Sequence, residues 1–212
     1  MTGTAPEWVA RLGSAARAGQ VGTLERRLGG TGDGRSSAVL MCFAARVDGA
    51  PPRVDVLLMQ RAATLRNHAG QVSFPGGTTD PGDADARETA LREAGEEVGL
   101  DPTSVTIIGE LPVLSLTVTG YRVTPILAWW HRPHPVAAVD AAEVARVALV
   151  AVSDLVDPAR RFEVRHPSGR SSPGFEAAGL FIWGFTALLL DAVLDMAGWS
   201  VAWDRTVTRT VP

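Results

Sequence analysis

The segment from His68 to Leu100 reads HAGQVSFPGGTTDPGDADARETALREAGEEVGL, and its second half is typical of a helix. Asp85 and Glu88 lie three residues apart, where an N-cap side chain and an N3 carboxylate can accept from otherwise unpaired backbone N–H groups. Gly99 stands where a C′ glycine ends a helix. Four apolar side chains fall on one side and are expected to face a core: Ala90, Leu91, Ala94 and Val98.

The opposite side of this predicted helix is acidic. Glu93, Glu96 and Glu97 are spaced i, i+3 and i+4, so their carboxylates converge on one face. Like charges at this spacing repel one another, and a hard divalent cation such as Mg²⁺ removes the repulsion by taking carboxylate oxygens. The alternative is a solvated acidic face without a ligand. Gly95 disfavours that alternative, because an exposed glycine inside a helix costs roughly 1 kcal/mol relative to alanine.

The run from Arg92 to Leu100, REAGEEVGL, resembles the second half of the Nudix box, the signature of the Nudix hydrolase family. Gly77 supplies the opening glycine of that box. The first half departs from the general pattern, because Asp83 stands where a glutamate is usual and lies one residue further from Arg92. These departures, together with FPGG at 74–77 and DPGD at 80–83, resemble the coenzyme A pyrophosphatase branch of the family.

A second motif lies immediately upstream. The segment 60–73, QRAATLRNHAGQVS, resembles the extra signature that this branch carries before its Nudix box, although Ala62 replaces a small hydroxyl residue. The resemblance implies an α/β/α sandwich with a mixed β-sheet, with the acidic helix packed on the sheet. Strand-like runs outnumber helical ones and do not alternate regularly with them, which also favours a mixed sheet. We expect residues 1–36 to form a helical extension and linker, and residues 37–212 to form the Nudix hydrolase domain.

The resemblance also implies an activity, which is metal-dependent hydrolysis of the diphosphate of coenzyme A or its derivatives. The expected products are adenosine 3′,5′-bisphosphate and 4′-phosphopantetheine. Glu93, Glu96 and Glu97 are the expected ligands of Mg²⁺ or Mn²⁺. Glu93, Glu97 and Glu143 are the candidates for a direct catalytic role, with Glu93 the first choice as general base. The sequence does not separate the ligand from the base.

Several residues are candidates for binding the substrate. Arg61 and Arg66 suit phosphate groups, since a guanidinium binds them as a fork, and His68 can donate to a phosphate oxygen. Gly76 and Gly77 either let the backbone approach the diphosphate or only shape the turn into the helix.

Two other functions remain open from the sequence. One is a Nudix hydrolase that acts on another nucleoside diphosphate derivative, such as a dinucleotide or ADP-ribose. The other is a Nudix-fold module that binds a nucleotide without turnover. The intact set of three glutamates disfavours the second of these. Asp80 and Asp83 likewise have two readings, as supports of the metal site or as turn-forming residues.

The composition of the chain limits the classes of binding partner that we expect. The chain has 212 residues, 46% of them hydrophobic, which suits one domain with a sizeable core. Its net charge of −3 and the absence of a basic stripe argue against a nucleic-acid partner. The single cysteine, Cys42, cannot form an internal disulfide and is expected to be a buried thiol, which suits a reducing cytosol. No apolar run reaches the ~20 residues that a membrane-spanning helix needs. We therefore expect a cytoplasmic protein without a membrane partner, and a homodimer remains open.

Overall fold

The computed structural model describes residues 5–18, 34–46, 53–116, 120–166, 169 and 171–211. Its helices are α1 (Glu7–Arg17), α3 (Ala86–Val98), α4 (Val152–Val156) and α5 (Gly184–Met196), with 3-10 turns at η1 (Pro102–Ser104) and η2 (Pro158–Arg160). The strands of the main sheet are β1 (Arg35–Arg46), β2 (Arg53–Arg61), β3 (Val72–Ser73), β4 (Gly76–Thr78), β5 (Val105–Glu110), β6 (Leu114–Leu116), β7 (Tyr121–Trp130) and β8 (Val144–Ala151). A second sheet contains β9 (Arg161–Arg165), β10 (Ser171–Ala177), β11 (Leu180–Ile182) and β12 (Thr208–Thr210).

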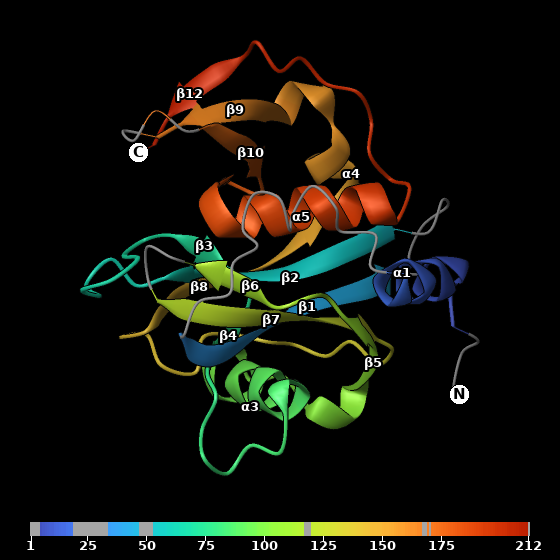
Figure 1. Ribbon diagram of the computed structural model, residues 1–212, viewed down its shortest axis with the longest axis vertical. Coiled ribbons are helices and arrows are strands. Elements are labelled where there is room, and N and C mark those ends of the chain that lie inside the picture. Colours follow the sequence, from blue (N-terminus) through green and yellow to red (C-terminus); the bar gives the residue numbers. More distant parts are fainter. Residues whose placement is uncertain are drawn as a thin grey trace.

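The main sheet is mixed. Its central path runs β3-β2-β1-β7-β5, while β4 pairs with β1, β6 with β7 and β8 with β2. The pair β1 and β7 is parallel, and the other pairs are antiparallel. Figure 1 shows α3 on one face of this sheet and α5 on the other. The predicted α/β/α sandwich with a mixed sheet is therefore confirmed.

Strand β1 is buried on both faces, as its near-continuous apolar run predicts. Met41 and Phe43 point into the cluster that includes residues of α1 and α5. Leu40 and Cys42 point into the opposite cluster, which includes Ala90, Ala94 and Val98 of α3. The predicted apolar side of α3 thus faces a core, and Leu91 lies at its partly buried margin. Cys42 is a buried free thiol.

Helix α1 packs against the same core cluster as α5. Leu12 is fully buried there, and the Trp8 ring lies 6.1 Å from the ring of Phe43 and 5.7 Å from that of Trp199. The linker predicted after this helix falls largely on residues 19–33, which lie outside the described residues. The proposed boundary between residues 36 and 37 remains a prediction.

Pro125 lies inside the sheet, although a proline in this strand predicts an edge position or a bulge. It is opposite Val39 of β1 in the parallel pair, and Leu111 donates its backbone N–H to the Pro125 carbonyl at 2.9 Å. Leu111 belongs to the connection between β5 and β6, both of which pair with β7. Pro125 therefore lies where the strand next to β7 changes from β5 to β6. No regular hydrogen bond between strands is lost there, although proline has no backbone N–H.

The second sheet was not predicted. The glycine, serine and proline residues of segment 167–174 predict a loop, but β10 begins at Ser171 and pairs with both β9 and β11. The sequence also predicts a short helical turn with Ser153 as its N-cap. The turn exists as α4, but its N-cap is Ala151 and no side chain caps it.

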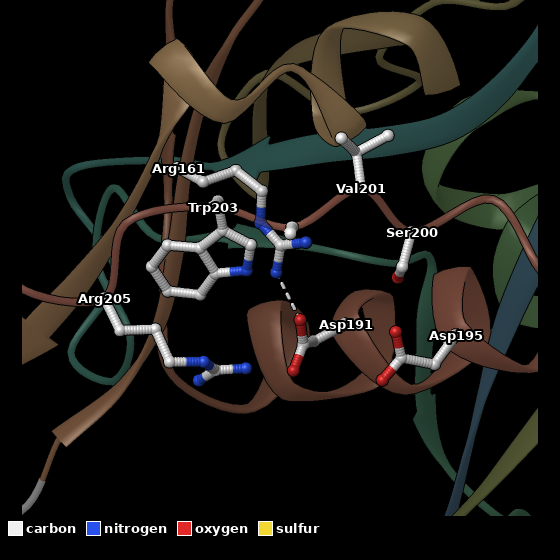
Figure 2. Close-up of a pocket in the computed structure, with 8 residues that line it drawn as sticks. Arg161, Asp191, Asp195, Ser200, Val201, Trp203 and Arg205 are labelled. Carbon is white, nitrogen blue, oxygen red and sulfur yellow. Dashed lines mark hydrogen bonds and ion pairs between the residues drawn. The ribbon is translucent and has the colours of Figure 1, made fainter.

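A buried arginine lies where α5 meets the second sheet. Arg161 is 2% exposed, and its Nη2 donates to the Asp191 carboxylate of α5. Its guanidinium lies 4.6 Å from the ring centroids of both Phe175 and Trp203. Figure 2 shows Arg161 beside Trp203. Both line a cavity of about 270 Å³, together with Asp195 and Arg205. Within the described residues, no helix is long and apolar enough to cross a membrane.

Candidate active site

Helix α3 begins and ends where its sequence predicts. The Asp85 side chain accepts from the backbone N–H groups of Arg87 at 2.8 Å and Glu88 at 3.0 Å. Gly99 ends the helix in the left-handed conformation, with φ of 70°. The Glu88 carboxylate accepts from the Ala84 N–H at 2.7 Å instead of returning to the cap residue. These contacts set where α3 begins and ends, while the packing of its apolar side on the sheet sets the direction of its acidic face.

Glu97 is the most enclosed carboxylate of that face. Its side chain is 7% exposed, and its Oε2 accepts from the Gly76 backbone N–H at 2.9 Å. Arg61 Nη1 lies 4.0 Å from its Oε1. Burial raises the pKa of Glu97 to about 7, and the negative charges of Glu93 and Glu143 add to the rise. The Gly76 N–H and Arg61 oppose it without cancelling it.

Glu93 lies against the glycine pair. Its side chain is 17% exposed and accepts from Arg92 Nη1 at 3.2 Å, while burial raises its pKa. A Cβ on Gly77 would lie 2.4 Å from Glu93 Oε1, so this position has to be glycine for the carboxylate to lie where it does. Gly76 has φ of 156°, and a Cβ there would lie 2.3 Å from the Ala38 carbonyl oxygen. Glycine is therefore required at the two positions for different reasons: at Gly77 to leave space for the Glu93 side chain, and at Gly76 by the backbone.

Arg92 ties the acidic helix to the preceding loop. Its Nε and Nη2 donate to the two carboxylate oxygens of Asp83, each at 3.0 Å, and Nη2 also donates to the Thr78 carbonyl. Its Nη1 donates to Glu96 Oε2 at 3.0 Å. Glu96 is 61% exposed, so this is the outermost of the three acidic side chains.

Asp83 is an anchor of the loop. Its side chain is 4% exposed and also accepts from Thr89 Oγ1 and from the Asp80 N–H, both at 2.9 Å. The Arg92 guanidinium holds the pKa of Asp83 well below its usual range. With both oxygens occupied in this way, Asp83 matches the turn-forming alternative better than a support of a metal. Asp80 is 64% exposed and lies 3.8 Å from Arg92.

The upstream signature brings one of its two arginines to the acidic helix. Arg61 ends β2 beside Glu97, and its backbone N–H donates to the Gln71 carbonyl at 2.9 Å. Arg66 and His68 lie on the exposed loop that follows. His68 has φ of 57°, and its Nδ1 lies 2.9 Å from Gln71 Oε1. In the described part of the chain, neither of them forms an ion pair with the three glutamates.

Glu143 lies at the base of the same loop. Its carbonyl accepts from the Ala62 N–H at 2.9 Å, and its side chain is exposed. Its charge contributes to the raised pKa of Glu97, so the two carboxylates are electrostatic neighbours. The structure therefore gathers Arg61, Glu93, Glu97, Glu143 and the glycine pair, with Glu96 at the rim.

The acidic face offers the hard oxygen donors that Mg²⁺ or Mn²⁺ takes. Among the residues described here, however, no three acidic, histidine or cysteine side chains are already arranged around a common metal position. Glu93 and Glu96 are turned to Arg92, and Glu97 is turned to the Gly76 N–H. The donor set fits a divalent cation in chemistry. The pKa of Glu97 is raised first by burial and then by the negative charges of Glu93 and Glu143. Glu96 has to leave Arg92 to join a shared coordination shell.

One supporting residue and one supporting ion pair were missed by the sequence analysis. Thr89 is fully buried and donates to Asp83, and the Asp83–Arg92 pair connects loop and helix. The only sequence signal for Thr89 is a hydroxyl residue adjoining the apolar side of the helix. For the pair, the signal is that the loop is one residue longer than the general pattern, which leaves room for a carboxylate to meet Arg92.

Comparison with known proteins agrees with this geometry. A family model described as the NUDIX domain matches residues 34–168. Curated proteins from Escherichia coli (strain K12 / DH10B) and Cronobacter sakazakii, each described as an uncharacterized Nudix hydrolase NudL, are 50% identical over 93 residues. That alignment covers 44% of this chain and 45% of each relative, so the chain spans less than half the length of these relatives.

A solved structure supports the fold. The crystal structure of a NUDIX hydrolase from Alicyclobacillus acidocaldarius superimposes with a TM-score of 0.51 at 19% identity. The superposition covers 82% of this chain and 100% of that one. At this identity the likeness concerns the fold alone.

Proposed function

The chain belongs to the Nudix hydrolase family, and we propose that it hydrolyses the diphosphate bond of coenzyme A or a coenzyme A derivative, with Mg²⁺ or Mn²⁺ as cofactor. The products are adenosine 3′,5′-bisphosphate and 4′-phosphopantetheine. One observation carries the choice of substrate. Arg61, from the signature typical of the coenzyme A branch, lies 4.0 Å from Glu97 of the acidic helix. The arginine that indicates the substrate therefore lies next to a glutamate that indicates metal-dependent hydrolysis.

In this proposal Glu96 and Glu97 hold the metal, and Glu93 beside them acts on the water. A bound divalent cation supplies charge neutralisation at the diphosphate and lowers the pKa of water. The Gly76 N–H orients Glu97, and the missing side chain of Gly77 leaves the space that Glu93 occupies. Arg92 holds the loop and the helix in register.

The general base is proposed to be Glu93. A base works best when its pKa approaches the working pH, and burial raises the pKa of Glu93. Glu97 also has a raised pKa, but it is held by the Gly76 N–H and is better placed as a ligand. Glu143 is exposed and close to Glu97, which makes it the second candidate for the base.

The substrate is tested by comparing kcat/KM across coenzyme A, NADH, ADP-ribose and nucleoside triphosphates with added Mg²⁺ or Mn²⁺. The proposal predicts the highest kcat/KM for coenzyme A. A preference for NADH or ADP-ribose would favour the alternative of a hydrolase for another nucleoside diphosphate derivative. Nucleotide binding without metal-dependent product release would favour a binding module.

Gly77→Ala is expected to lower kcat by about ten- to hundredfold, because the added Cβ displaces Glu93 and misplacing a catalytic group by ~1 Å costs about that much. The clash is with the end of a flexible side chain, so the fold should survive. Steady-state kinetics and a thermal melt measure the two effects. Gly82→Ala is the matched control, since its Cβ would meet no atom within 4 Å. Unchanged kcat in a folded Gly77→Ala protein would show that the position of Glu93 is unimportant.

A further inference from the structure

We infer that Arg61 binds the diphosphate that is cleaved, while Arg66 on the exposed loop binds the phosphate monoester at the other end of the nucleotide. The inference rests on the proposed function and divides the two arginines of the upstream signature between two phosphate groups. It makes Arg61 necessary for any nucleoside diphosphate substrate. It makes Arg66 necessary only for substrates that carry the additional monoester.

Pairing on both sides holds the backbone of Arg61 at the end of β2. β2 pairs with β8 along its length, and the register of that pair shifts between Gln60 and Arg61. The extra residue of this irregularity, Ala145, belongs to β8, so the bend lies in β8 beside the end of β2. On the other side, the Arg61 N–H is held by the Gln71 carbonyl, and Gln60 Nε2 donates to the Gly70 carbonyl at 3.1 Å. Arg61 is therefore fixed at the point where its strand ends.

The donors of Arg61 are not used up by Glu97. The separation of 4.0 Å between Nη1 and the carboxylate exceeds hydrogen-bond distance, so the contact is an ion pair without a hydrogen bond. The Nε atom is buried and has no hydrogen-bond partner. Buried donors in native proteins nearly always have an acceptor. The side chain is 30% exposed, so a ligand oxygen can reach the guanidinium, and a phosphoryl oxygen is the acceptor that its fork suits.

Arg66 lies in a different environment. It is exposed on the loop between Arg61 and Gln71, and it makes no ion pair in the described part of the chain. The loop is pinned at its ends by the bonds to Gly70 and Gln71. Figure 1 shows the loop between β2 and β3 extending outward from the sheet. In coenzyme A the 3′-phosphate is carried by the ribose and is separate from the diphosphate. If the diphosphate is bound next to Glu97, the 3′-phosphate lies apart from it, where Arg66 of the loop can bind it.

The test compares coenzyme A with its 3′-dephospho form. Arg61→Ala is expected to lower kcat/KM about ten- to hundredfold for both substrates, and Arg66→Ala to lower it about tenfold or more for coenzyme A alone. Arg53→Ala is the matched control, because Arg53 is exposed at the opposite end of β2. The assignment of the two arginines to different phosphate groups would be overturned by either of two results. One is that Arg61→Ala lowers kcat/KM for coenzyme A only, and the other is that Arg66→Ala lowers it equally for both substrates.

A second measurement separates substrate binding from support of Glu97. ADP binding is titrated calorimetrically in Glu97→Gln and in the double variant Glu97→Gln/Arg61→Ala. If Arg61 touches the diphosphate, the double variant binds ADP at least about tenfold more weakly. Equal affinities would mean that Arg61 serves only as a counter-ion of Glu97. Arg61→Lys keeps the charge but lacks the guanidinium fork, so a full ADP affinity in the Lys variant would contradict binding through that fork.

The outcome for Arg61 is independent of the preferred nucleotide. If the wild-type protein cleaves ADP-ribose but neither form of coenzyme A, the proposed function is wrong. Arg61→Ala should then still lower kcat/KM for ADP-ribose, since that substrate also contains a diphosphate. Unchanged turnover of ADP-ribose by the variant would overturn the inference itself.

Discussion

Glu97→Gln is expected to lower kcat by more than about a hundredfold at saturating Mg²⁺ while the protein stays folded. Loss of a mere supporting contact at a metal site already costs about 10- to 100-fold, and Glu97 is proposed to be a ligand. A neutral amide is also a poor partner for a hard dication. The measurement is kcat with coenzyme A, with folding checked by circular dichroism. Glu110→Gln, an exposed carboxylate paired with Arg87, is the control and should keep full activity.

The same substitution should stabilise the metal-free protein at high pH. The pKa of Glu97 is about 7 in the folded protein, against 4.5 ordinarily, so folding holds on to a proton that the unfolded chain releases. Stability therefore falls as the pH rises from about 4.5 through 7. Removing the carboxylate at about pH 8 can recover at most about 3 kcal/mol, at ~1.36 kcal/mol for each pKa unit. Urea unfolding in chelator measures it, and an equal effect at pH 8 and pH 4.5 would contradict the burial of this charge.

Asp191→Asn is expected to destabilise the fold by about 3–5 kcal/mol, because removing one partner of a buried ion pair leaves the other charge without compensation. Arg161 is that partner, and it is 2% exposed (Figure 2). The rings of Phe175 and Trp203 flank its guanidinium and offset only part of the loss. The free energy of unfolding from urea titration measures the effect.

Asp195→Asn provides the matched control for this prediction. Asp195 lies one turn further along α5 and is exposed, so its substitution should change the free energy by less than about 0.5 kcal/mol. Similar values for Asp191→Asn and Asp195→Asn would show that Arg161 does not depend on Asp191. Neither substitution touches the glutamates, so kcat should stay unchanged in whatever fraction is folded.

Local chemistry explains why the acidic helix could be predicted. Its start depends on the Asp85 side chain and its end on the left-handed Gly99, and both effects act within a few residues. The convergence of Glu93, Glu96 and Glu97 also follows from helical geometry alone. The doubly buried β1 was predictable for a similar reason, because its apolar run leaves no polar face.

Contacts between distant segments could not be predicted. Helical spacing places Glu88 and Glu96 beside Arg92, but Arg92 pairs with Glu96 and with Asp83 of the preceding loop. The Gly76 N–H that holds Glu97 comes from a strand whose position is set by its pairing with β1. The second sheet joins β9 to β12 across more than forty residues, and short β-strands carry little local signal.

The central claim is that water cleaves the diphosphate of coenzyme A at the acidic face of α3. The most direct measurement is mass spectrometry of the products formed from coenzyme A and Mg²⁺ in water enriched in oxygen-18. We predict equal amounts of adenosine 3′,5′-bisphosphate and 4′-phosphopantetheine, with a single heavy oxygen in only one of the two products, and neither product from Glu97→Gln. Intact coenzyme A after incubation with the wild-type protein, or release of its 3′-phosphate alone, would contradict the claim.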